Sequence, residues 1–175
     1  LLSELKTCGL NIASGEDVEL YKDNDFTYGL MIEHLRKLLQ LGKLSDSQLD
    51  ILRNMSLLPV SGVLKNSFKS WMKLDSLTDV NHLIKYGFVN EDMDNRKISL
   101  HSLLQEVITI ETAPTVTACQ TLLNNLHLIC LAHGLELRRP ENIIASLISV
   151  SERIIVDDGA YFLLFLQDMF PYLDK

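Results

Sequence analysis

Apolar residues recur every three or four positions through most of this chain, which is the spacing of amphipathic α-helices. In the middle of the chain, three such segments follow one another, over residues 45–58, 66–74 and 76–86. Ser45 and Gln48 fit a capping box, in which each side chain bonds the backbone N–H of the other residue, and Pro59 ends that helix. Residues 60–64 are predicted to be a connector. We therefore predict three short helices in succession.

The clearest β signal follows the third of these helices. Two short runs, residues 88–90 and 97–100, combine apolar and polar positions and flank a tip at residues 91–96 that is rich in Asp and Asn. A further helix begins at His101. The predicted order for residues 45–110 is therefore helix, helix, helix, hairpin and helix, which is typical of a winged-helix domain.

Helical spacing also marks both flanks of this unit. On the N-terminal side we predict a helix tail over residues 1–10, a short hairpin within residues 11–28 and a helix over residues 28–41. After a break at Ala113-Pro114, three more helices are predicted, namely from Thr115 or Thr117 to His133, from Pro140 to a turn at residues 157–159, and from Tyr161 to Leu173. With no strand between them, they are expected to pack as helical hairpins or as one or two degenerate repeats.

The two ends of the chain and its last helix suggest continuation into a longer protein. Both ends fall inside helical patterns, so we expect an internal piece. The helix that begins at Tyr161 is dense in apolar residues, including Phe162, Phe165, Phe170 and Tyr172. We expect it to expose a patch that further helical repeats would cover.

The composition is that of a folded protein and narrows the choice of partners. Hydrophobic residues make up 47% of the 175 residues and charged residues 22%, and the net charge is −7. A negative net charge argues against nucleic-acid binding, which requires a basic face. Three cysteines with no close pair indicate free thiols and a cytoplasmic location. No apolar run is long enough to predict a membrane span.

Catalytic and metal-binding motifs are not found in the sequence. None of the eight glycines belongs to a phosphate-binding loop pattern, and there is no CxxC, HExxH or nucleophile elbow. His127 and His133 fall on different faces of their predicted helix, so a shared metal is not expected. Cys119 and Cys130 are expected to fill the core as small apolar groups. We predict that this chain is not an enzyme on its own.

A winged helix would bind DNA through its third helix and its wing, and the charges do not suit that role. The third helix offers Asn81, His82 and Lys85 but no arginine, and the wing tip is acidic. Acidic side chains also slightly outnumber basic ones over residues 45–110. A regulatory winged helix therefore fits better than a DNA reader.

Several segments in the same order resemble a known family. The segments are Leu44 to Pro59, Phe68-Lys69-Ser70-Trp71, Leu83 to Val89, and Ile98 to Val107. This series is similar to the winged-helix domain of the STAND signal-transduction ATPases, the NB-ARC class, in their bacterial form with tetratricopeptide repeats. The resemblance implies three parts: residues 1–43 as the end of the small helical domain after the ATPase core, residues 44–111 as the winged-helix domain, and residues 112–175 as a helical linker into the repeats.

The resemblance implies one functional residue, His101. In the family, a Met-His-Asp triplet lies between the wing and the following helix, and its histidine contacts the β-phosphate of bound ADP. Leu100-His101-Ser102 occupies that place here, with Ser102 where the family has Asp. An imidazole N–H at a helix start can donate to an anionic phosphate. The alternative is that His101 only begins the helix.

The expected function is therefore regulatory. The resemblance implies a switch in which ADP or ATP, with magnesium, is bound by the ATPase core of the parent protein, and His101 holds the ADP-bound closed state. The implied partners are the ATPase core and the repeat domain of the same chain, with oligomerisation of the parent on activation. Two alternatives stay open, a DNA-binding transcription regulator and a protein-interaction scaffold.

Overall fold

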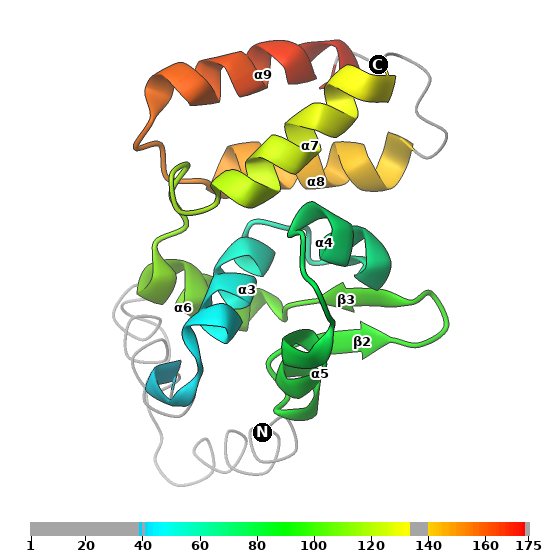
Figure 1. Cartoon of the computed structure of the whole chain (residues 1–175), viewed down its shortest axis with the longest axis vertical. Helices are drawn as coiled ribbons and strands as arrows, with labels where there is room; N and C mark the ends of the chain where they lie inside the picture. The colour runs from blue at the N-terminus through cyan, green and yellow to red at the C-terminus, as the bar shows by residue number, and fades with distance from the viewer. Residues whose placement is uncertain (1–38, 40, 134–139, 174–175) are drawn as a thin grey trace, which may run out of the picture.

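The computed structural model describes residues 39, 41–133 and 140–173, and these form a mainly helical protein (Figure 1). The described part contains seven α-helices and a three-stranded antiparallel sheet, preceded by a short 3-10 helix, η2 (Leu41–Lys43). The mainly helical class with a small sheet agrees with the prediction. The elements predicted for residues 1–38 lie outside the described residues.

The first long helix, α3 (Asp46–Ser56), begins at the capping box that the sequence predicts. The backbone N–H of Gln48 donates to the Ser45 hydroxyl at 3.2 Å, and the Ser45 N–H donates to the Gln48 side-chain oxygen at 3.1 Å. Two backbone donors that no helical carbonyl can reach are thereby satisfied. The helix buries one apolar stripe, which consists of Ile51, Leu52 and Met55.

Strand β1 (Val63–Leu64) lies within the segment that the sequence predicts to be a connector, so that prediction is wrong for these two residues. Val63 pairs with Ile98 and Leu64 pairs with Lys97. The preceding residue, Gly62, has φ +80°, and a Cβ there would lie 2.9 Å from the Ile98 carbonyl oxygen. Only glycine fits both the backbone conformation and the close approach of the neighbouring strand.

Two short helices follow, α4 (Lys65–Trp71) and α5 (Thr78–Lys85). They bury the apolar residues expected of them, including Phe68, Trp71, Val80 and Leu83. The N-cap of α5 is Leu77, and the Ser76 hydroxyl accepts the Thr78 N–H at 3.3 Å.

The hairpin consists of β2 (Asn90–Asp92) and β3 (Lys97–Ser99), and the sheet order is β1-β3-β2. Its first strand begins two residues later than predicted. Phe88 and Val89 are buried, but their backbone N–H groups both donate to the Leu83 carbonyl at the end of α5. These two N–H groups bond a carbonyl at the end of α5 and are not available to the sheet. The first strand therefore begins later and includes part of the predicted tip.

Helix α6 (Ser102–Thr112) packs against α3, and two polar side chains, one from each helix, tie it to the C-terminal part of α3. The buried side-chain amide of Gln105 donates to the carbonyls of Ser56 and Leu58, each at 2.7 Å, where α3 ends. Arg53 donates from Nε to the Thr112 carbonyl, 3.0 Å away, at the C-terminus of α6. A cation at a helix C-terminus is favourable because that end carries partial negative charge.

Three helices complete the described chain, α7 (Gln120–His133), α8 (Pro140–Arg153) and α9 (Gly159–Leu173). The predicted start of α7 at Thr115 or Thr117 is wrong. Thr115 forms an isolated parallel bridge with Ile155, and the Thr117 N–H donates to Asp157 at 3.0 Å. These contacts hold the backbone extended and then in turns, so the helix begins at Gln120.

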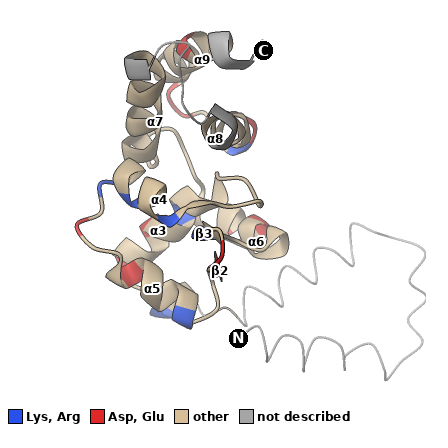
Figure 2. Ribbon diagram, turned by 90° about the vertical axis from the view of Figure 1, so that its right-hand side faces the viewer, with Lys and Arg blue, Asp and Glu red and all other residues tan. Residues whose placement is uncertain are grey.

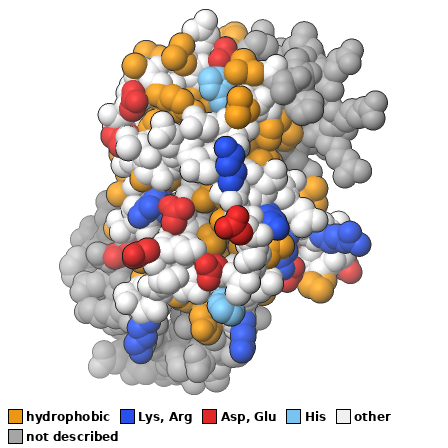
Figure 3. Space-filling model, viewed as in Figure 1, with side chains coloured by type: hydrophobic (Ala, Val, Ile, Leu, Met, Phe, Trp, Pro, Cys, Tyr) orange, Lys and Arg blue, Asp and Glu red, His pale blue; other side chains and the backbone are white. Residues whose placement is uncertain are grey.

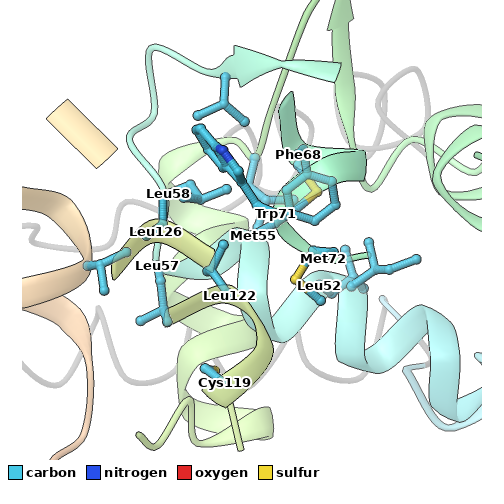
Figure 4. Packing of buried hydrophobic residues seen from close by; sticks show 14 of the residues in the cluster. Leu52, Met55, Leu57, Leu58, Phe68, Trp71, Met72, Cys119, Leu122 and Leu126 are labelled. Carbon is cyan, nitrogen blue, oxygen red and sulfur yellow. The ribbon is translucent and has the colours of Figure 1, made fainter. Parts of the chain in front are cut away.

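The three last helices lie on one side of the molecule and the sheet with α3 to α6 lies on the other (Figure 1). Their buried side chains nevertheless form one continuous core. Figure 4 shows Leu122 and Leu126 of α7 beside Leu57 and Trp71. The Asn125 amide also donates to the Trp71 carbonyl at 2.7 Å. Helix α7 is therefore anchored to the unit that contains the sheet.

No helix in the described ranges combines the length and the hydrophobicity that crossing a bilayer requires.

Replacement of Gln105 tests the tie between α6 and α3. We expect Gln105→Leu to lower the free energy of unfolding by about 2–3 kcal/mol, because two interior carbonyls lose their amide donor. Urea denaturation measures the change. The matched control is Gln120→Leu, an exposed position at the start of α7, which should change stability by less than about 0.5 kcal/mol. Equal effects of the two substitutions would contradict this role for Gln105.

Candidate functional site

His101 lies at the junction between strand β3 and helix α6, as the sequence predicts. The side chain of the preceding residue, Leu100, is buried in the core, whereas His101 is exposed. His101 is the N-cap of α6, with an extended backbone conformation of φ −64° and ψ 139°. Its carbonyl accepts the Gln105 N–H at 2.8 Å, which is the first hydrogen bond of the helix. The imidazole is therefore held at the mouth of α6.

The imidazole of His101 has a defined hydrogen-bonding state. Its Nδ1 atom accepts the backbone N–H of Leu103 at 3.3 Å. A nitrogen that accepts cannot also carry a proton, so in the neutral ring the proton resides on Nε2. The ring can thus cap the helix through one nitrogen and donate a hydrogen bond to another group through the other.

The surroundings of His101 suit an anion. The first turn of α6 contains no acidic side chain, and the N-terminus of this 11-residue helix carries partial positive charge. Ser102, the first residue of the helix, is exposed and makes no hydrogen bond to the ring among the described contacts. The hydrogen bond that orients the imidazole therefore comes from the backbone of Leu103 and not from Ser102.

Helix α5 and the β2–β3 hairpin carry acidic side chains that form hydrogen bonds and ion pairs within the fold. Asp79 of α5 accepts the Ser47 hydroxyl at 2.7 Å, which links α5 to α3. Glu91 pairs with Lys65 at 2.6 Å. Figure 2 shows basic and acidic residues mixed along α5 and its neighbours, without a continuous basic stripe.

At the tip of the hairpin, Asp92 organises the turn. Its carboxylate accepts the side-chain amide of Asn95 at 2.7 Å and the backbone N–H groups of Asn95 and Asp94, each at 3.1 Å. These hydrogen bonds lower the pKa of Asp92 below its usual value of 3.8, and the bond from the Asn95 side chain has the largest effect. The Asp92 carboxylate therefore stays charged at neutral pH and stabilises the turn at the hairpin tip.

The cysteines that are described lie in the core. Burial raises the pKa of Cys119 to about 12 and that of Cys130 to about 11, because the apolar surroundings penalise a thiolate. Neither thiol is ionised at neutral pH, so neither is an activated nucleophile. Among the described residues, no group of three or more His, Cys, Asp or Glu side chains could hold a metal ion.

His127 has a structural partner that sequence reasoning missed. Its Nε2 lies 2.5 Å from a carboxylate oxygen of Asp168, and its ring contacts Tyr161 and Phe165 edge-on. Tyr161 in turn donates from its hydroxyl to Asn124 at 2.6 Å. These contacts join α7 to α9. Nothing in the spacing of the two residues, 41 positions apart, signals the pair.

Gln105 also escaped sequence reasoning, although a signal was present. It lies three residues before Ile108 and so on the buried face of α6, where a polar side chain requires a partner. The sequence indicates that such a partner exists but not which one, because the two carbonyls lie 47 and 49 residues away.

Two substitutions of His101 test how much its capping hydrogen bond stabilises the fold. We expect His101→Ala to lower the free energy of unfolding by about 1 kcal/mol, since the Leu103 N–H loses its acceptor. His101→Ser should stay close to the parent, because serine is a good N-cap. Urea denaturation of both variants measures the difference. Equal destabilisation by the two would show that the cap contributes nothing.

Comparisons with known protein families, with curated proteins and with solved structures gave no match for this chain. The functional assignment therefore depends on the residues and contacts described above.

Proposed function

We propose that this chain is the winged-helix and helical-linker portion of a nucleotide-dependent signalling switch of the STAND ATPase class. In this proposal His101 donates from Nε2 to the β-phosphate of ADP that is bound by the ATPase core of the parent protein. The observation that carries the proposal is the outward donor of His101 at a helix mouth without acidic side chains. The element order supports it as well.

That order runs helix, strand, two helices, and then two strands joined by an exposed tip, followed by α6. A winged-helix domain consists of three helices with a small sheet whose hairpin forms the wing. Strand β1 supplies the sheet with the strand that the sequence-based prediction lacked. We therefore propose that α3, α4 and α5 are the three helices and that the β2–β3 hairpin is the wing.

The contacts around α6 suggest how occupancy at His101 would affect the rest of the chain. His101 begins α6, Gln105 on the next turn bonds the end of α3, and Leu57 after α3 lies beside α7. A phosphate that holds His101 would thus stabilise the closed arrangement of α6, α3 and α7. ADP would favour the closed state by its differential affinity for it, and exchange for ATP with magnesium would release it.

The nucleotide contact is tested in the full-length parent with His101→Ser, which keeps the helix cap. We expect ADP to bind about 10-fold to 100-fold more weakly, as the loss of a hydrogen bond to a charged group predicts, and basal signalling to rise. Isothermal titration calorimetry measures the affinity. The control is Glu106→Gln, an exposed position on the second turn of α6, which should leave ADP binding unchanged.

Calorimetry of this 175-residue chain alone tests whether it binds ADP without the ATPase core, and we expect no binding. Micromolar affinity of the chain alone would contradict the division between core and winged helix. An unchanged ADP affinity of the full-length His101→Ser variant would show that His101 acts only as a helix cap.

A second candidate function is DNA binding, and one observation favours it. The exposed face of α5 presents Asn81, His82 and Lys85, which are side chains that can contact base edges. The charged wing carboxylates oppose it. We expect no mobility shift with duplex DNA at low salt, where phosphate contacts are strongest. A shift that is lost on Lys85→Ala would favour the DNA-binding function instead.

A further inference from the structure

Two connecting segments of the chain are hydrogen-bonded to each other. One is the α6–α7 connector, residues 113–119, and the other is the α8–α9 turn, residues 154–158. The Ile155 N–H donates to the Pro114 carbonyl at 2.9 Å, and the Val116 N–H donates to the Ile155 carbonyl at 3.1 Å. These bonds form the parallel bridge between Thr115 and Ile155. Segments 40 residues apart in the sequence are thereby joined.

This junction lies between two surfaces of different character. Figure 3 shows apolar side chains gathered at the end that α7 and α9 form, and most of the charged side chains over the unit that contains the sheet. In Figure 1 the connector and the turn lie together at one side of the molecule, where these two units meet. The Thr112 carbonyl, which Arg53 bonds, directly precedes the connector. The junction therefore attaches α8 and α9 to the end of the α3–α6 pair.

Polar contacts hold most of the α8–α9 turn in place. Ile154 is buried, but every residue from Ile155 to Asp158 is exposed. The Asp157 carboxylate accepts the Thr117 N–H at 3.0 Å, and this bond is the main reason that the pKa of Asp157 lies below its usual value of 3.8. Segments held by exposed hydrogen bonds, with little buried apolar surface, are the parts of a protein that open first.

The connector is strained next to the bridge. Ala113 ends α6 in the left-handed conformation, with φ 42° and ψ 78°, where glycine is the usual residue. A side chain in this conformation costs energy and persists only where neighbouring contacts require it. The next residue, Pro114, is fixed by the bond from Ile155. Opening of the bridge would let Ala113 relax, so its strain favours the open junction.

We propose that the α8–α9 turn is a strap, which closes on the α6–α7 connector through the Thr115–Ile155 bridge and Asp157 and opens locally while the core stays folded. Helix α7 stays anchored when the strap opens, because Leu122 packs beside Trp71 and Asn125 donates to the Trp71 carbonyl. The open strap uncouples α8 and α9 from the end of α6. This device does not depend on the nucleotide contact, since it shares no residue with His101.

The thiol of Cys119 reports on the strap. It is buried at the end of the connector. Burial raises its pKa most, and Asp157 raises it further, so the Asp157 carboxylate lies near this thiol. Opening of the strap should therefore admit a thiol reagent to Cys119. Cys130, also buried but eleven residues further along α7, serves as the internal control for opening of the helix itself.

Iodoacetamide labelling of the 175-residue chain under native conditions tests the proposal, in a Cys8→Ser background that leaves two thiols. Mass spectrometry of the peptides measures the labelling rate at each thiol. We expect Asp157→Ala to accelerate labelling of Cys119 about 10-fold, since the Thr117 N–H loses a charged acceptor. Ala113→Gly should slow it about 3-fold, because the closed strap is then no longer strained. Labelling of Cys130 should change in neither variant.

Two matched controls lie in the hairpin tip. Asp94→Ala removes another exposed carboxylate, and Arg96→Gly relieves another left-handed residue, with φ 53°. Both should leave labelling of Cys119 unchanged, and circular dichroism checks that every variant keeps its helices. An unchanged Cys119 rate in Asp157→Ala would overturn the proposal. So would equal acceleration at Cys119 and Cys130, because the helical unit would then open as a whole, or a Cys119 rate that Ala113→Gly does not slow.

Discussion

The amide of Gln105 is the interaction on which the arrangement of this molecule depends. It bonds the carbonyls of Ser56 and Leu58 at the point where α3 ends and the chain turns toward the sheet. A helix end buried without such a donor would leave polar groups unsatisfied in the core. This bond holds α6 against the end of α3, and Arg53 in the last turn of α3 donates to the Thr112 carbonyl at the end of α6. His101 lies one turn before Gln105, so the same hydrogen bonds also fix the position of His101.

That position fixes the hydrogen bonding of the His101 ring. A histidine that caps a helix uses one ring nitrogen as an acceptor, and this commits the proton of the neutral ring to the other nitrogen. The cap therefore prepares a donor that faces outward at the positive end of a helix. Capping and the proposed nucleotide contact would use different nitrogen atoms of the ring, so one would not exclude the other.

The two ends of the described chain differ in the polarity of their exposed surfaces. The unit with the sheet presents a mixed, charged surface whose acidic side chains are tied into turns and ion pairs (Figure 2). The unit of α7, α8 and α9 anchors itself on Leu57 and Trp71 and presents an uncharged apolar helix face outward. The described chain thus has a polar, charged end around the sheet and an apolar, largely uncharged end around α9.

The sequence by itself determined the features that depend on neighbours along the chain. Helical spacing predicted α3 to α9, the Ser45–Gln48 box placed one helix start, and the burial of Cys119 and Cys130 followed from their apolar surroundings. Only the tertiary structure decided what depends on distant partners. Two residues become β1 because Ile98 and Lys97 lie alongside, and Phe88 stays out of the sheet because its N–H completes α5. The hydrogen-bond partners of Gln105 also depend on the tertiary structure, because they lie 47 and 49 residues away. The same is true of the pairing of His127 with Asp168, which is 41 residues away.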